Sequence, residues 1–130
     1  MLPFSIDIKP GLPIAEQVLF AVKKAVVTGQ LRTGDKFPSV RALSQELRIN
    51  PNTAHKVVAQ LVDEGVLVTT PAVGSVVAAR ALGDRRARAE LLGPELERAI
   101  VEAKKLGLSV EDVQAAVVAH WRKLSDHSQP

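Results

Sequence analysis

The 130-residue sequence predicts a mainly α-helical protein with one small β-hairpin. Two observations give this fold class. Along several segments, apolar residues recur three and four positions apart, which is the spacing of an α-helix with one buried face. Residues 66–79 instead hold two runs rich in β-branched side chains around Pro71 and Gly74, which is typical of two strands and their turn.

The first 35 residues predict a short strand, a helix and a turn. Alternating apolar and polar residues indicate a strand at 4–8. Pro13 suits the first turn of a helix, because the missing N–H has no partner there. Apolar residues at helical spacing continue this helix over 14–26, and the Thr-Gly pair at 28–29 ends it. A Thr-Gly-Asp turn follows at 33–35.

Two further helices are predicted with a very short turn between them. Ser39 is a good N-cap for a helix of about two turns, which must end before Pro51. Asn50 can cap the next helix, whose apolar stripe spans 54–62. The connecting turn is only residues 48–50. Two helices joined by so short a turn form a helix-turn-helix, whose second helix can lie in the DNA major groove.

The outward face of that second helix carries side chains suited to double-stranded DNA. Asn and Gln can pair bidentately with adenine, and Lys can reach guanine or a phosphate. A solvated polar face on an ordinary helix is the alternative, but the hairpin that follows favours a winged helix-turn-helix. The helical wheel places Asn52, Lys56, Ala59, Gln60 and Asp63 outward, with Thr53 and His55 beside them and the apolar centre near Ala54, Val58 and Leu61.

Two more positions fit a DNA contact. Arg41 lies in the first turn of the preceding helix, where it can meet a phosphate or a base edge, although a salt bridge to Glu46 or Asp35 is an alternative. Gly74 in the hairpin would let a phosphate approach the backbone closely.

The positive charge of the chain is concentrated in this part. Residues 1–82 carry nine Lys and Arg against six Asp and Glu, whereas residues 83–130 carry eight of each. The excess lies between residues 32 and 56, and such a basic patch suggests a polyanion partner.

Several motifs, in this order and spacing, resemble the DNA-binding domain of GntR-type bacterial transcription regulators. They are PIAEQV at 13–18, GQLRTGDKFPSVR at 29–41, NPNTAHK at 50–56, EG at 64–65 and GSVV at 74–77. The resemblance implies a homodimer on a palindromic operator, usually acting as a repressor. It assigns DNA contacts to Ser39, Arg41, Asn50, Asn52, Thr53, Lys56 and Gly74, and the helical wheel adds Gln60.

The sequence departs from the family pattern at the tip of the wing. Relatives often carry one or two Arg in this loop, whereas residues 71–74 have none. The resemblance therefore does not extend to a contact between the wing and the minor groove.

Residues 83–130 are predicted to form a short helical dimerisation region, separate from a winged helix-turn-helix domain at 1–82. A helix over 83–92 is broken or kinked by Gly93-Pro94, its apolar stripe continues to Leu106, and a capping box at 109–112 starts the last helix. This short tail resembles the YtrA subfamily of the GntR regulators.

An apolar seam on these helices is the predicted dimer interface. Isolated helices of this length are marginal in water, so we expect a second copy to cover the seam about a two-fold axis. The alternative is that the seam packs only within its own chain. The seam consists of Leu96, Ile100, Val110, Val113, Val117, Trp121 and Leu124.

The composition excludes several other functions. The sequence has no Cys, and therefore no disulfide framework, zinc–thiolate site or Cys nucleophile. It has no phosphate loop, nucleophile elbow or HExxH motif. Its three histidines, His55, His120 and His127, do not supply the converging ligands of a metal site. We expect neither an enzyme nor a cofactor.

The remaining expectations concern location and partners. No apolar run approaches the roughly 20 residues of a membrane span, and the start lacks the regions of a signal peptide, so we expect a cytoplasmic protein. The sequence leaves open whether a small-molecule effector binds, and Trp121 is the side chain on which such an effector could stack. The competing function is a winged-helix protein–protein adaptor with little or no DNA binding.

Overall fold

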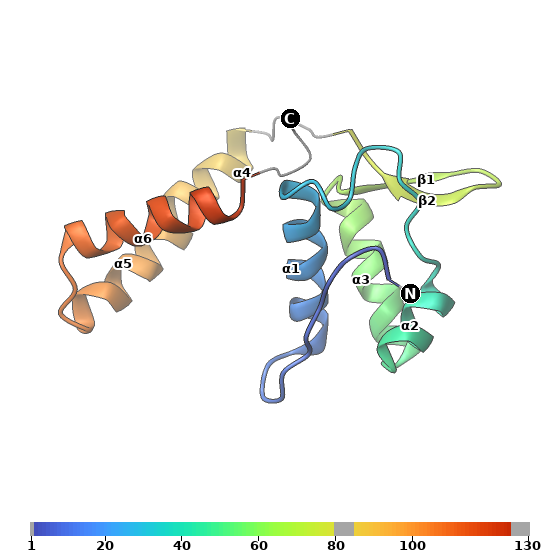
Figure 1. The fold of residues 1–130 in the computed structure, drawn as a ribbon, viewed down its shortest axis with the longest axis horizontal. Coiled ribbons are helices and arrows are strands. Elements are labelled where there is room, and N and C mark those ends of the chain that lie inside the picture. The colour runs from blue at the N-terminus through green and yellow to red at the C-terminus, as the bar shows by residue number, and fades with distance from the viewer. Residues whose placement is uncertain (1, 80–84, 126–130) are drawn as a thin grey trace. The chain divides into compact units, whose positions relative to one another are not determined.

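The computed structural model describes residues 2–79 and 85–125, which form two compact units (Figure 1). One unit consists of residues 2–79 and the other of residues 85–125. The predicted boundary between residues 82 and 83 lies outside the described residues.

The first unit contains three helices followed by an antiparallel hairpin. Its elements are α1 (Ile14–Val27), α2 (Val40–Leu47), α3 (Pro51–Asp63), β1 (Leu67–Thr70) and β2 (Gly74–Val77). This order confirms the predicted mainly α-helical fold with a small hairpin.

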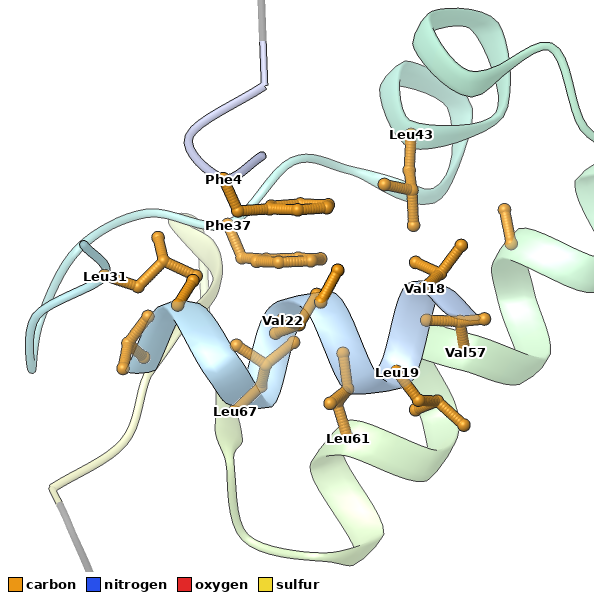
Figure 2. Packing of buried hydrophobic residues seen from close by; sticks show 14 residues of the cluster. Phe4, Val18, Leu19, Val22, Leu31, Phe37, Leu43, Val57, Leu61 and Leu67 are labelled. Carbon is orange, nitrogen blue, oxygen red and sulfur yellow. The ribbon is translucent and has the colours of Figure 1, made fainter. Parts of the chain in front are cut away.

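The hydrophobic core lies between the three helices of the first unit (Figure 2). Leu43 of α2 and Leu61 of α3 are fully buried in this core. The predicted apolar centre of α3 is shifted by one residue, because Val57 is buried whereas Val58 is only half-buried. Val62, at the edge of the predicted stripe, is exposed. The reason is that α3 packs against both α1 and α2, so the buried stripe follows the side that faces both helices.

The predicted strand at 4–8 is wrong. Phe4 is buried and stacks on Phe37, with ring centroids 5.9 Å apart (Figure 2). The free edge of β2 is taken by residues 34–37 instead, since the Phe37 N–H donates to the Ser75 carbonyl at 2.9 Å. The alternation at 4–8 therefore reflects Phe4 and Ile6 packing on the core rather than strand pairing.

An ion pair between Lys23 and Glu64 ties α1 to the C-terminal end of α3. Burial raises the pKa of Glu64, but hydrogen bonds from Lys23 and Gln60 and the positive charge of Lys23 outweigh this effect, so the pKa lies below the ordinary value of 4.5. Because folding lowers the pKa of Glu64, the ion pair stabilises the folded protein at pH values above the pKa that Glu64 has in the unfolded chain. This contribution is lost as the pH falls through the folded pKa.

We therefore expect Glu64→Gln to lower the free energy of unfolding by at most about 1 kcal/mol near neutral pH, because the pair is partly exposed to solvent. The difference from the wild type should disappear in acid. Chemical unfolding at several pH values measures it, with the exposed Glu102→Gln of the second unit as control. A difference that grows towards acid pH would contradict this assignment.

The second unit is a helical hairpin that begins with an interrupted helix. Its elements are α4 (Arg85–Glu90), the π-helical turn η1 (Leu91–Glu95), α5 (Leu96–Lys105) and α6 (Val110–Lys123). The predicted start of the first helix at residue 83 lies outside the described residues.

Gly93-Pro94 does not break the helical path. Pro94 has no N–H to donate within the helix, and the Leu96 N–H bonds to the carbonyl of Leu91, five residues earlier. This wider π turn accommodates the proline while the backbone stays in the helical region at Glu90 and Leu96. The predicted interruption at Gly93-Pro94 is therefore a π-helical turn and not a break.

The corner between α5 and α6 forms as predicted. Gly107 has a φ of 77° just after α5. The Ser109 N–H donates to the Asp112 carboxylate at 3.0 Å, and the Asp112 N–H donates to the Ser109 hydroxyl at 3.1 Å. This capping box lowers the pKa of Asp112, mainly through the hydrogen bond from the Ser109 backbone.

Candidate nucleic-acid interface

The turn between α2 and α3 is held by a buried hydroxyl group. Arg48 adopts a left-handed backbone conformation, with a φ of 54°, and the Ile49 N–H returns to the Ser44 carbonyl at 3.1 Å. The buried Ser44 hydroxyl donates to the Ile49 carbonyl at 2.8 Å. The turn at 48–50 is thus confirmed. The role of Ser44 was missed, although a Ser directly after an apolar core residue is a weak signal for such a brace.

The N-caps of α2 and α3 are both confirmed. The Ser39 hydroxyl accepts from the Ala42 N–H at 3.1 Å, and the Asn50 side-chain oxygen accepts from the Asn52 N–H at 2.8 Å. Each cap therefore uses its oxygen inside the protein. What remains for DNA is a donor in each case, the hydroxyl proton of Ser39 and the amide NH₂ of Asn50.

Asn52 and Lys56 lie one turn apart on the exposed side of α3. Neither side chain forms a hydrogen bond or ion pair within residues 2–79 and 85–125. Thr53 lies beside them and is half-buried. The helix therefore presents an amide and an ammonium group outward with their bonding capacity unused.

Gln60 is placed differently from this pair. At 1.5 Å per residue it lies about 12 Å along the helix from Asn52. Its amide nitrogen donates to the Glu64 carboxylate at 3.0 Å. Gln60 is thus exposed but already engaged within its own helix.

The guanidinium group of Arg41 is exposed in the first turn of α2. Among the described residues it makes no ion pair with Asp35 or Glu46, the two partners considered from the sequence. Asp35 instead accepts the backbone N–H of Arg32 at 2.8 Å and closes the preceding turn. Arg41 is therefore available to an external anion.

The hairpin forms a wing without cationic side chains. Leu67 pairs with Val77 and Thr70 with Gly74, so a three-residue turn connects the strands. Gly74 has a φ of 95°, and a Cβ at this position would meet no atom within 4 Å. The glycine is therefore required by the backbone conformation, and the space beside it is open.

The second unit exposes the predicted dimer seam. No residue between 85 and 125 is buried. Trp121 is 78% exposed, Val110 62% and Val117 51%. A hollow of about 200 Å³ at the corner of α5 and α6 is lined by seam residues Ile100, Val110 and Val113, together with Ala103, Lys104, Leu108 and Ser109.

The seam packs only partly within its own unit. Val113 and Leu124 are half-buried, whereas Leu96 and Ile100 are exposed like most of the seam. Contacts within the second unit therefore do not bury the whole seam, as the alternative to a dimer interface would require of them.

Membrane-spanning helices and metal sites are both absent from the described residues. In the described ranges, no helix is long and apolar enough to cross a membrane. No group of His, Asp and Glu side chains in those ranges is arranged to hold a metal ion. His127 lies outside the described residues.

Three helices with a tight turn, a hairpin wing and an exposed polar helix face define a winged helix-turn-helix, which is the domain of a DNA-binding transcription regulator. Comparison with known proteins agrees. The model of the bacterial regulatory proteins of the gntR family matches residues 14–77. The transcriptional repressor YtrA of Bacillus subtilis is 30% identical over 107 residues, which is 82% of each chain. The chain therefore belongs to the gntR family, whose members are transcription regulators and not enzymes.

The similarity extends over both units. The crystal structure of a transcriptional antiterminator from Listeria monocytogenes is 28% identical and matches with a TM-score of 0.83, covering 93% of this chain and 91% of that one. YtrA from Sulfolobus acidocaldarius, a GntR-family transcription factor, is 27% identical with a TM-score of 0.53 and covers 92% and 97%. These relatives confirm the predicted YtrA-like subfamily.

Proposed function

We propose that this protein represses transcription by binding a palindromic operator as a homodimer in the cytoplasm. The observation that carries the proposal is the outward pair of Asn52 and Lys56, whose side chains have no partner among the described residues. The name of the Bacillus relative, a transcriptional repressor, supports the direction of regulation.

The DNA-binding roles follow from the donors and acceptors that each side chain has left. Asn52 pairs bidentately with an adenine edge, and Lys56 reaches guanine or a phosphate. Arg41 and the helix N-termini at Ser39 and Asn50 hold phosphates, because free donors and the helix dipole favour anions there. Thr53, Gln60 and Gly74 complete the proposed surface. Gln60 contributes least, since its amide nitrogen is engaged by Glu64.

The homodimer places two recognition helices about one DNA turn apart, or a multiple of it, which a palindromic operator requires. The exposed seam around Val117 supplies the surface for it. A small-molecule effector stacking on Trp121 would act on this seam and so change operator affinity.

Binding to DNA tests the proposal directly. We expect the full chain to bind a duplex carrying the inverted repeat upstream of its own gene more tightly than a random duplex. We also expect affinity to fall steeply with salt, as phosphate contacts require. Fluorescence anisotropy at several salt concentrations measures both. Salt-independent or absent binding would favour the protein–protein adaptor instead.

A cation added to the wing should change the salt dependence. Residues 66–79 have no Lys or Arg, so the wing neutralises no phosphate by charge. We expect Ala72→Arg to steepen the slope of log K against log salt by about 0.9, the value for one added phosphate contact. Ala72 is already a non-glycine residue in the left-handed backbone region, with a φ of 67°, so Arg at this position meets the same backbone strain as Ala. Ala72→Gln is the uncharged control, and an unchanged slope for Ala72→Arg would place the tip away from DNA.

A further inference from the structure

A lysine lies beside the wing, whose own residues 66–79 include no Lys or Arg. The segment between α1 and α2 runs along the free edge of β2 before it enters α2 (Figure 1). The Val77 N–H donates to the Asp35 carbonyl at 2.8 Å, and the bond from the Phe37 N–H closes the pairing on the other side. These two bonds place Lys36 directly opposite Val76, in the type of antiparallel pair that brings facing residues closest together.

Lys36 lies on the solvent face of this small sheet. Residues that face each other across neighbouring strands share a face, so Lys36, Val76 and Val68 form one row. The opposite face carries Leu67 and Val77, which are both buried in the core. Lys36 is exposed, and its ammonium group makes no hydrogen bond or ion pair with any described residue. The sheet therefore presents a cation outward, next to a hairpin that has none.

The neighbouring carboxylate of Asp35 does not pair with this cation. Successive residues of a strand point to opposite faces, so Asp35 leaves the sheet on the other side from Lys36. Its carboxylate accepts the Arg32 backbone N–H at 2.8 Å, which closes the preceding turn. The carboxylate thus has a local partner, and the charge of Lys36 is available to an external anion.

Lys36 also lies between two parts of the proposed DNA-binding surface, all within the first unit. Ser39, the N-cap of α2, follows three residues later, and three extended residues span at most about 11 Å. Gly74 lies two residues from Val76 along β2, which is about 7 Å at the rise of a strand. A duplex that contacts both the start of α2 and the wing therefore passes within reach of Lys36.

We propose that Lys36 binds a DNA phosphate at the base of the wing and supplies the positive charge that the wing lacks. The proposal rests on the proposed function. An ammonium group binds phosphate as a point charge, and such a contact adds affinity without reading bases. In this arrangement the cationic contact comes from the segment beside β2 and not from the tip of the hairpin.

The test compares three single variants of the full chain. Lys36→Gln removes the proposed contact, whereas Lys36→Arg keeps its charge. Lys24→Gln removes the same charge from the exposed side of α1, the helix that packs on the buried side of α3. Binding to an operator duplex and to a random duplex is measured by fluorescence anisotropy over a series of salt concentrations, and thermal unfolding checks that each variant is folded.

We expect Lys36→Gln to reduce the slope of log K against log salt by about 0.9, because one phosphate contact is lost. Affinity should fall by a similar factor on both duplexes, since a phosphate contact carries no sequence information. Lys36→Arg and Lys24→Gln should keep the wild-type slope. Equal changes for Lys36→Gln and Lys24→Gln would show a general charge effect and overturn the site.

The remaining outcomes separate the site from the proposed function. An unchanged slope for Lys36→Gln, with salt-dependent binding by the wild type, refutes only the site. A slope reduced as much by Lys36→Arg as by Lys36→Gln also refutes it, because the lysine would then act through the local structure and not through its charge. If the wild type itself shows no salt-dependent DNA binding, the proposed function fails and the site fails with it.

Discussion

We expect that removing residues 83–130 leaves a folded monomer that binds an operator half-site weakly. All buried apolar side chains of the described residues lie in the first unit, so this unit has the core that it needs to fold alone. The second unit has exposed apolar helices and no buried residue between 85 and 125. Linking two binding modules raises affinity about 10²- to 10⁴-fold, and we expect the truncated chain to lose a factor in this range.

Sedimentation of the truncated chain, together with its thermal unfolding, checks both parts of this expectation. A dimer that persists after truncation would place the interface in residues 1–82 and overturn the assignment of the seam.

A substitution in the full chain separates loss of the dimer from loss of the helices. Val117→Asp puts a charge in the middle of the seam, where it would be buried by the second copy, and we expect monomers at concentrations where the wild type is dimeric. Ala115→Asp introduces the same charge on the exposed opposite side of α6 and should leave the dimer intact. Equal dissociation of both variants would show that the charge acts through the helix rather than through the interface.

We expect Asn52→Ala to weaken binding to the cognate operator by about 1–3 kcal/mol without weakening binding to random DNA. The side chain lies exposed in the first turn of α3 and forms no hydrogen bond with another described residue, so its oxygen and nitrogen are both available to a base. Base preference should relax at one position of each half-site.

Gln60→Ala is the matched control, because it deletes an amide from the same helix. The Gln60 amide nitrogen is held by Glu64, so a smaller loss is expected there. Titration of both variants with operator, random and singly substituted duplexes measures the effect. If Asn52→Ala loses affinity equally on cognate and random DNA, Asn52 is not a base reader.

Much of the fold was predictable because its signals are local. The caps at Ser39, Asn50 and Ser109 each depend on a side chain and a backbone N–H two or three residues away, and all three form as predicted. The tight turn at 48–50 follows from the cap at Asn50 and from Pro51, before which α2 must end. The outward position of Asn52 and Lys56 follows from helical periodicity.

Other features depend on contacts that no local pattern encodes. Alternation at 4–8 suggested a strand, but Phe4 meets Phe37 and the edge of β2 is already paired with residues 34–37. The ion pair of Glu64 with Lys23 joins two helices that are far apart in the sequence.

Local sequence was enough to predict the order of elements, the caps, the polar face of α3 and the family, because each depends on residues that are neighbours along the chain. The tertiary structure places Val57 rather than Val58 at the buried centre of α3, since that depends on how α1 and α2 pack against the helix. It also decided that Ser44 braces the turn and that a π turn carries the helix past Pro94. These outcomes depend on which backbone groups still need a hydrogen-bond partner once the chain has folded.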